Sequence, residues 1–116
     1  MYSKVTIWIA DIYESLKTLG LPVYMELPDE TVIEPFFVIG THFDDDSRSA
    51  KNGPILSTEL QIDLFFPTGK RVELEELIWA TKNVLKRRRQ ITSSIRIEDG
   101  TRSVYHVIFQ VSDSIY

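Results

Sequence analysis

The chain of 116 residues contains no cysteine. Disulfide bonds and thiolate metal sites are therefore excluded, and the composition is compatible with synthesis in a reducing, intracellular compartment. Histidine is scarce as well, because His42 and His106 are the only two imidazoles. They fall in different predicted strands, without the i, i+4 spacing of a helical metal site. We interpret both as solvated or core-edge side chains and expect no metal and no cofactor.

Long apolar runs are also absent. The longest, such as Phe36 to Ile39, are far shorter than the roughly 20 residues that cross a bilayer. The apolar run near the N-terminus is too brief for a signal peptide. The five glycines are dispersed, so no glycine-rich loop could cradle a phosphate group. We expect a soluble protein that is made in the cytoplasm and has no membrane partner.

The composition is that of an ordinary globular domain, with 43% hydrophobic and 26% charged residues. The length fits one domain covering residues 1–116. The net charge of −4 argues against a dedicated nucleic-acid binder, because affinity for phosphate depends on clustered lysine and arginine.

Apolar residues at spacings of three and four predict two helices, over residues 4–19 and 70–87. Gly20 is suited to end the first helix, because glycine readily adopts the left-handed conformation found there. The two tryptophans, Trp8 and Trp79, are predicted to be core or interface anchors. The buried stripe of the second helix is expected to contain Leu74, Leu77, Ile78, Thr81 and Leu85.

Five segments have the composition of strands: residues 23–25, 36–43, 58–66, 91–98 and 103–112. The segment 58–66 alternates cleanly, which is typical of a half-buried antiparallel strand. Asp99-Gly100 between the last two segments predicts a hairpin. The pattern as a whole predicts an α+β fold, with a mixed, mainly antiparallel sheet of four to five strands flanked by two helices. The alternation places Leu60, Ile62 and Leu64 on one side of its strand and Glu59, Gln61 and Asp63 on the other.

A long polar loop is predicted over residues 44–55, and a loop of this length in a small domain is a candidate for contact with a partner. Its charged residues are Asp44, Asp45, Asp46, Arg48 and Lys51. A basic run follows the second helix and consists of Lys86, Arg87, Arg88 and Arg89. Either charged segment could simply be solvated. We hypothesise instead that the acidic and basic segments meet head to tail between subunits, as a cyclic ring requires.

A small α+β domain could also be a metal-dependent nuclease. Such a site needs carboxylates and a lysine around a divalent ion, typically as an acidic residue, any residue and a lysine on one strand. The nearest candidate, Glu59-Leu60-Gln61, has glutamine where lysine is required. We therefore expect no catalytic residues and no enzymatic activity. If the nuclease alternative held, Glu59 or Asp63 would carry the cleavage.

Several segments together resemble the small tail proteins of long-tailed bacteriophages, namely the tail terminator or head-to-tail joining proteins. The segments are Glu34 to Gly40, the loop with Ser49 to Gly53, the strand Thr58 to Phe66, the helix start Lys70-Arg71, and the ending from Ile97 to Gly100 and from Tyr105 to Phe109. The similarity covers most of the chain. It rests on patterns of strand and turn residues.

The resemblance implies a structural ring protein, usually a hexamer, that caps the tail tube and docks it to the connector under the capsid. Its partners would be other copies of itself, the major tail protein and the head-tail connector, with DNA only as passing cargo. It would be assembled in the bacterial cytoplasm and reside in the virion tail, or belong to a prophage. Glu59, Gln61 and Asp63 could then line the channel, because acidic residues repel phosphate. The remaining alternative is a generic bacterial adaptor domain.

Overall fold

The computed structural model describes residues 3–45, 56–86, 90–99 and 103–115. The elements, in chain order, are α1 (Lys4–Lys17), β1 (Val23–Tyr24), β2 (Phe36–Asp45), β3 (Leu56–Pro67), α2 (Arg71–Leu85), β4 (Gln90–Asp99) and β5 (Ser103–Ile115). The predicted α+β class is confirmed, since two helices accompany one mixed, mainly antiparallel sheet of five strands.

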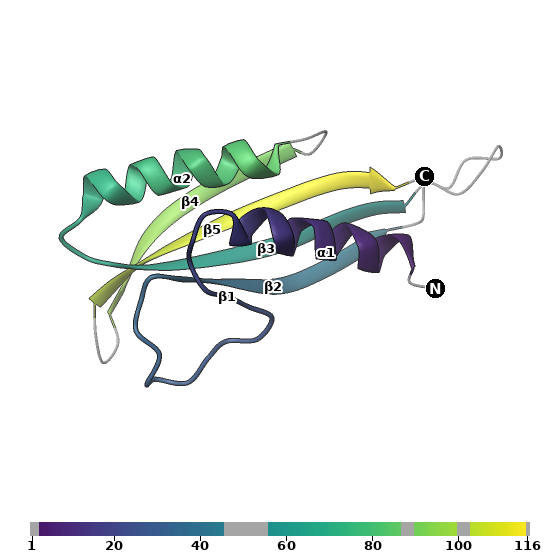
Figure 1. Ribbon diagram of the computed structural model, residues 1–116. Helices are drawn as coiled ribbons and strands as arrows, with labels where there is room; N and C mark the ends of the chain where they lie inside the picture. The colour runs from purple at the N-terminus through teal and green to yellow at the C-terminus, as the bar shows by residue number, and fades with distance from the viewer. Residues whose placement is uncertain (1–2, 46–55, 87–89, 100–102, 116) are drawn as a thin grey trace.

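The strands lie in the order β1-β2-β3-β5-β4. Only β1 pairs in parallel, with β2, and all other neighbours are antiparallel. Both helices lie on one face of the sheet, α1 over β2 and β3 and α2 alongside β4 (Figure 1). We call this the helix face and the opposite one the open face. Alternation along the strands places the following described residues on the open face: Phe36, Val38, Phe43, Glu59, Gln61, Asp63, Phe65, Thr92, Ser94, Arg96, His106, Ile108, Gln110 and Ser112.

Helix α1 begins at a capped end and buries one stripe. The side chain of Ser3 accepts a hydrogen bond of 3.1 Å from the backbone N–H of Thr6, which satisfies one of the donors left unpaired at a helix start. The helix ends at Lys17, two residues earlier than predicted, and Gly20 follows with a φ of +84° as expected. Its buried residues are Trp8, Ile12 and Leu16.

Helix α2 runs from Arg71 to Leu85, within the predicted range. Leu74, Ile78, Thr81 and Leu85 are buried, as the predicted stripe requires, whereas Leu77 is half-buried. Trp79 is 66% exposed. It is therefore not a core residue, and only the prediction that it anchors an interface stays open.

The core fills the space between the helices and the sheet. Leu60, Ile62 and Leu64 are buried on the helix face of β3, as the alternation predicted. They pack in one cluster with Val107 and Phe109 of β5 and with the buried residues of both helices. The chain therefore has one continuous hydrophobic core.

The strands continue further than their apolar patterns indicated. Strand β3 covers 56–67 and β5 covers 103–115, because their ladder continues through polar pairs such as Thr58 with Asp113. The prediction that the loop begins at residue 44 is wrong, because Asp44 and Asp45 pair with Thr58 and Ser57 as the last residues of β2. An irregularity between Ile39 and His42 inserts one extra residue into β2.

Truncating the core at β3 should destabilise the protein strongly. Leu64→Ala should lower the free energy of unfolding by about 3 kcal/mol, because it removes buried methyl groups and leaves a cavity. Val72→Ala, at a side chain that is 73% exposed on α2, is the matched control and should change stability by less than about 0.5 kcal/mol. Urea unfolding followed by circular dichroism measures both. Equal effects would contradict the assignment of the core.

Candidate interaction surface

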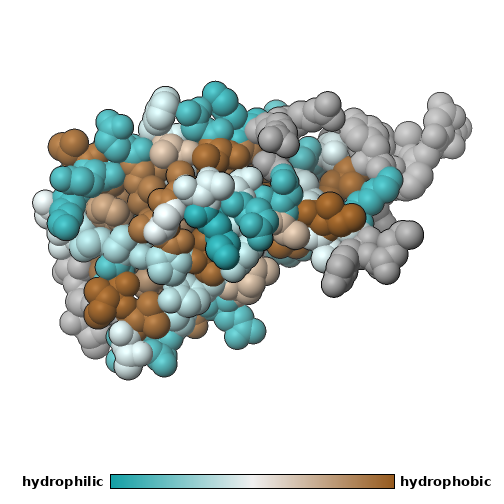
Figure 2. Space-filling model, in the orientation of Figure 1, coloured by the Kyte–Doolittle hydropathy of each residue, from teal (hydrophilic) through white to brown (hydrophobic). Residues whose placement is uncertain are grey.

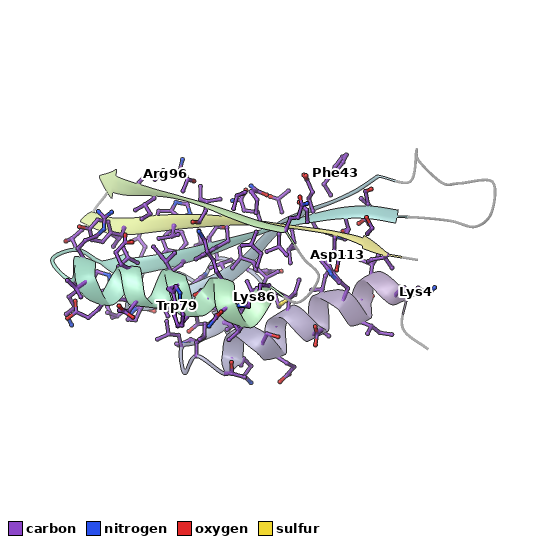
Figure 3. All side chains as sticks on the ribbon, turned by 90° about the horizontal axis from the view of Figure 1, so that it is seen from above. Lys4, Phe43, Trp79, Lys86, Arg96 and Asp113 are labelled. Carbon is purple, nitrogen blue, oxygen red and sulfur yellow. The ribbon has the colours of Figure 1, made fainter. Side chains whose placement is uncertain are left out.

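The open face is polar and carries little positive charge. Among the described residues, Arg96 is the only lysine or arginine that lies on a strand. Arg96 and Phe43 both project from the side of the sheet away from the helices (Figure 3). The open face also carries neutral polar side chains from β3, β4 and β5, including Gln61, Thr92 and Gln110. The face therefore offers hydrogen-bonding groups more than charge.

A hydrogen-bonded cluster around two buried side chains, Asp63 and His106, lies on this face. His106 Nε2 lies 2.7 Å from Asp63 Oδ1, and the amide of Gln61 donates to the same oxygen at 3.0 Å. A guanidinium nitrogen of Arg96 lies 3.3 Å from His106 Nδ1. Because arginine can only donate, Nδ1 accepts this bond and the Nε2–H donates to Asp63. The arrangement fixes one tautomer of His106 and satisfies both buried side chains.

Aromatic rings extend this cluster across the sheet. The ring of Phe65 stacks on His106 with centroids 4.4 Å apart, and Phe36 lies 5.2 Å from Phe65. Tyr24 meets Phe36 edge to face at 5.7 Å. Gly40 leaves room for the carboxylate, because an added Cβ there would lie 2.9 Å from Asp63 Oδ2 and one of the two groups would have to shift. The cluster, with Arg96 included, thus connects side chains from all five strands.

A groove of about 470 Å³ runs beside this cluster. Its walls come from the segment after β1, with Met25 and Leu27, and from the sheet, with Gly40, Asp63 and His106. Met25 and Leu27 are both more than half exposed. Further along the same segment, hydrogen bonds from the hydroxyl and backbone N–H of Thr31 lower the pKa of Asp29. The groove is open to solvent, and both apolar and polar side chains line it.

A second polar cluster lies on the helix face at the far end of β2. His42 Nε2 lies 2.7 Å from Thr58 Oγ1 and 2.8 Å from Asp44 Oδ1, and the Thr58 hydroxyl donates to Asp44 at 2.7 Å. Nearby, Trp8 Nε1 donates to Asp113 Oδ2 at 2.8 Å. A nucleophilic triad needs the two histidine nitrogens to bind different partners. Here the same nitrogen, His42 Nε2, contacts both Thr58 and Asp44. The group therefore stabilises the end of the strand and is not arranged as a triad.

The predicted channel residues share the open face but differ in exposure. Glu59 is exposed and Gln61 is half-buried, so both can contact a neighbour or the contents of a channel. Asp63 is only 9% exposed and is bonded to His106. Asp63 is therefore less available for such contacts than Glu59, because the sequence alternation showed its side of the strand but not its partner on β5.

The predicted charged segments are described only in part. Asp44 lies at the end of β2 with its side chain 38% exposed, and Lys86 follows directly after α2 and is exposed. Of Asp45 only the place in β2 is described. The other predicted interface residues lie outside the described residues: Asp46, Arg48, Lys51, Arg87, Arg88 and Arg89.

Both borders of the sheet leave strand edges unpaired within the described chain. Strand β4 is the last in the strand order, so one of its edges has no neighbour along the whole strand. Strand β1 pairs with β2 only at Phe37 and Val38, which leaves residues 39–45 of β2 without a partner on that side. A second groove, of about 270 Å³, borders β4 and is formed by Trp79, Lys82, Asn83, Lys86 and Ile91.

Sequence reasoning did not find the two histidine clusters. Asp63 and His106 are 43 residues apart, and they meet only because β3 and β5 are neighbours with Phe65 opposite His106. The alternation did indicate that Asp63 points away from the core. If the strand order had been known, the signal would have been an aspartate and a histidine that point to the same face from two adjacent strands.

A scan against protein-family models matches none of them, and a search of curated proteins finds no similar sequence. No helix in the described part of the chain is long and apolar enough to cross a membrane. Within the same residues, no three histidine or acidic side chains gather where they could hold a metal ion.

Breaking the pair of Asp63 and His106 should show how much it contributes to the stability of the fold. His106→Phe keeps a ring to stack on Phe65 but removes the donor to the buried Asp63, and it should destabilise the protein by about 2 kcal/mol. Adding Asp63→Asn to that variant should cost much less than the same change in the wild type, a coupling of about 1 kcal/mol. Gln110→Ala on the exposed part of the face is the control. Additive effects in urea unfolding would contradict the pairing.

Proposed function

We propose that this protein is a structural, non-enzymatic component of a phage or prophage tail, which caps the tail tube and joins it to the head connector as a ring. The observation that carries the proposal is the sheet, which in the described part of the chain has helices on one face only and unpaired edges at both borders. Such unpaired borders are surfaces that a ring can use for its subunit contacts. The resemblance of the sequence to tail terminator proteins supports the same role.

The chemistry of the open face supports a passage for DNA. Binding to DNA depends on lysine and arginine that neutralise phosphates. Among the described strand residues the only lysine or arginine, Arg96, is engaged with His106, while Glu59 is exposed and Gln61 and Gln110 are neutral. Such a surface would let a phosphate backbone pass without retaining it. Glu59 and Gln61 are the residues that we place toward the lumen.

Exposed apolar side chains support an assembly role. Figure 2 shows hydrophobic side chains in separate patches among hydrophilic ones on the side that carries α1. The exposed large hydrophobic residues are Ile7, Met25, Leu27, Ile33, Phe43, Val72 and Trp79. Tryptophan and other aromatic residues are the commonest anchors of protein interfaces. We therefore propose that Trp79 and Phe43 contact other subunits, and that the major tail protein and the connector bind elsewhere on the ring.

The capping function can be tested with the major tail protein of the same phage or prophage. Tubes polymerised from that protein should stop growing when this chain is added, and electron microscopy should show a ring at one tube end. Trp79→Ser should weaken the capping, whereas Val72→Ser, at a similarly exposed site on the same helix, should leave it unchanged.

Two outcomes would contradict the proposed function. One is tube growth that continues unchanged when the protein is present in excess, with no density at the tube ends. The other is cation-dependent cleavage of DNA that is lost in Glu59→Gln, which would establish the nuclease alternative instead.

A further inference from the structure

We propose that copies of this chain join edge to edge, with the outer edge of β4 pairing antiparallel to residues 39–45 of β2 in the next copy. The inference rests on the proposed function for the identity of the partner, a second copy in a ring. The surfaces themselves come from the fold. Both edges are unpaired within the described residues, so β4 offers an uninterrupted row of backbone donors and acceptors, and β2 offers such groups on either side of the irregularity between Ile39 and His42.

The first six residues of strand β4 lack the features that normally protect an edge. Exposed edges are usually short, charged, interrupted by proline or distorted by bulges. Strand β4 has ten residues, and its register with β5 is continuous from Gln90 to Asp99. Its first six residues, 90–95, include no charged residue and no proline. A regular edge whose first six residues carry no charge favours pairing with another strand.

The direction of the strands determines how two copies can continue one sheet. Three successive antiparallel pairings connect β2 to β3, β5 and β4, so β2 and β4 run in opposite directions. A rotation that places β2 of the next copy beside β4 therefore makes an antiparallel pair and keeps all helices on one side. Each copy uses a different edge toward each neighbour, and such heterologous contacts form a ring when the rotation between successive copies closes.

The charges beside the two edges are complementary. Asp44 lies on the helix face of β2, together with His42. Lys82 and Lys86 line the groove between α2 and Ile91 at the start of β4, which is also on the helix face. Neither lysine forms an ion pair with a described residue. If the edges pair with all helices on one side, the acidic end of β2 in one copy lies beside this basic groove of the next. The exposed Trp79 forms part of the groove wall.

The open face supplies an apolar contact on the other side of the joined sheet. Phe43 lies on the open face near the end of β2 and is 61% exposed. In a continuous sheet its neighbours across the junction would be open-face residues of β4, such as Thr92 and Ser94. Side chains directly opposite each other in a sheet lie close enough to be cross-linked.

The absence of cysteine makes this geometry directly testable, because introduced cysteines are the only thiols. Phe43→Cys is combined in turn with Gln90→Cys, Thr92→Cys and Ser94→Cys, which sample three registers on the open face. Mild oxidation should convert at least one of these variants into a ladder of dimers, trimers and higher species on a denaturing gel. Phe43→Cys with Ser93→Cys, which faces the helices, is the matched control and should give no ladder.

The outcomes separate this inference from the proposed function. No ladder in any of the three variants overturns the edge pairing, and so does a product limited to dimers, which would indicate a two-fold contact. If such variants still cap tail tubes, the proposed function stands and the ring uses another surface. If the ladder forms but tubes are not capped, the edge pairing stands and the proposed function fails.

A charge exchange tests the basic groove independently. Lys86→Glu should weaken self-association severalfold, and adding Asp44→Lys should restore it, because the two charges are then exchanged across the junction. Lys17→Glu makes the same change in net charge in the last turn of the other helix, α1, and should have no effect. Failure of the double variant to recover, with its circular dichroism spectrum unchanged, would contradict the contact between Asp44 and the groove.

Discussion

The antiparallel ladder between β3 and β5 is the constraint on which the rest of the structure depends. It pairs residues without interruption from Leu56 with Ile115 to Pro67 with Val104. Because successive side chains point to opposite faces, this single register places Leu64 and Val107 under the helices and Asp63 and His106 on the open face. A shift by one residue would bury the polar row and expose the core.

The sequence alone predicted those features that depend on local periodicity. The alternation of residues 58–66 and the stripe of α2 were sufficient to identify the two surfaces that form the core. Features that depend on which strands are neighbours could not be predicted in this way. The pairing of Asp63 with His106, the continuation of β2 through Asp44 and the exposure of Trp79 all follow from strand order and packing. None of these has a signal within one segment.

The two faces of the sheet have different physical roles in this account. The helix face supplies the hydrophobic burial that stabilises the fold. The open face retains polar groups, and its most demanding members, Asp63 and His106, satisfy each other and leave Glu59 and Gln61 available to the surroundings. Among the described residues, the unpaired edges of β2 and β4 lie toward opposite borders of the same sheet. A protein with this arrangement can extend its sheet through copies of itself while keeping the helices on one side.

The central claim is that the protein works as an assembly of copies, and the solution mass tests it most directly. Light scattering should be recorded over a wide range of protein concentration, at low and moderate salt, with and without the major tail protein. The account predicts a mass that rises with concentration toward a closed ring of several subunits, and less readily at higher salt. A strict monomer under all these conditions, including in the presence of the major tail protein, would contradict it.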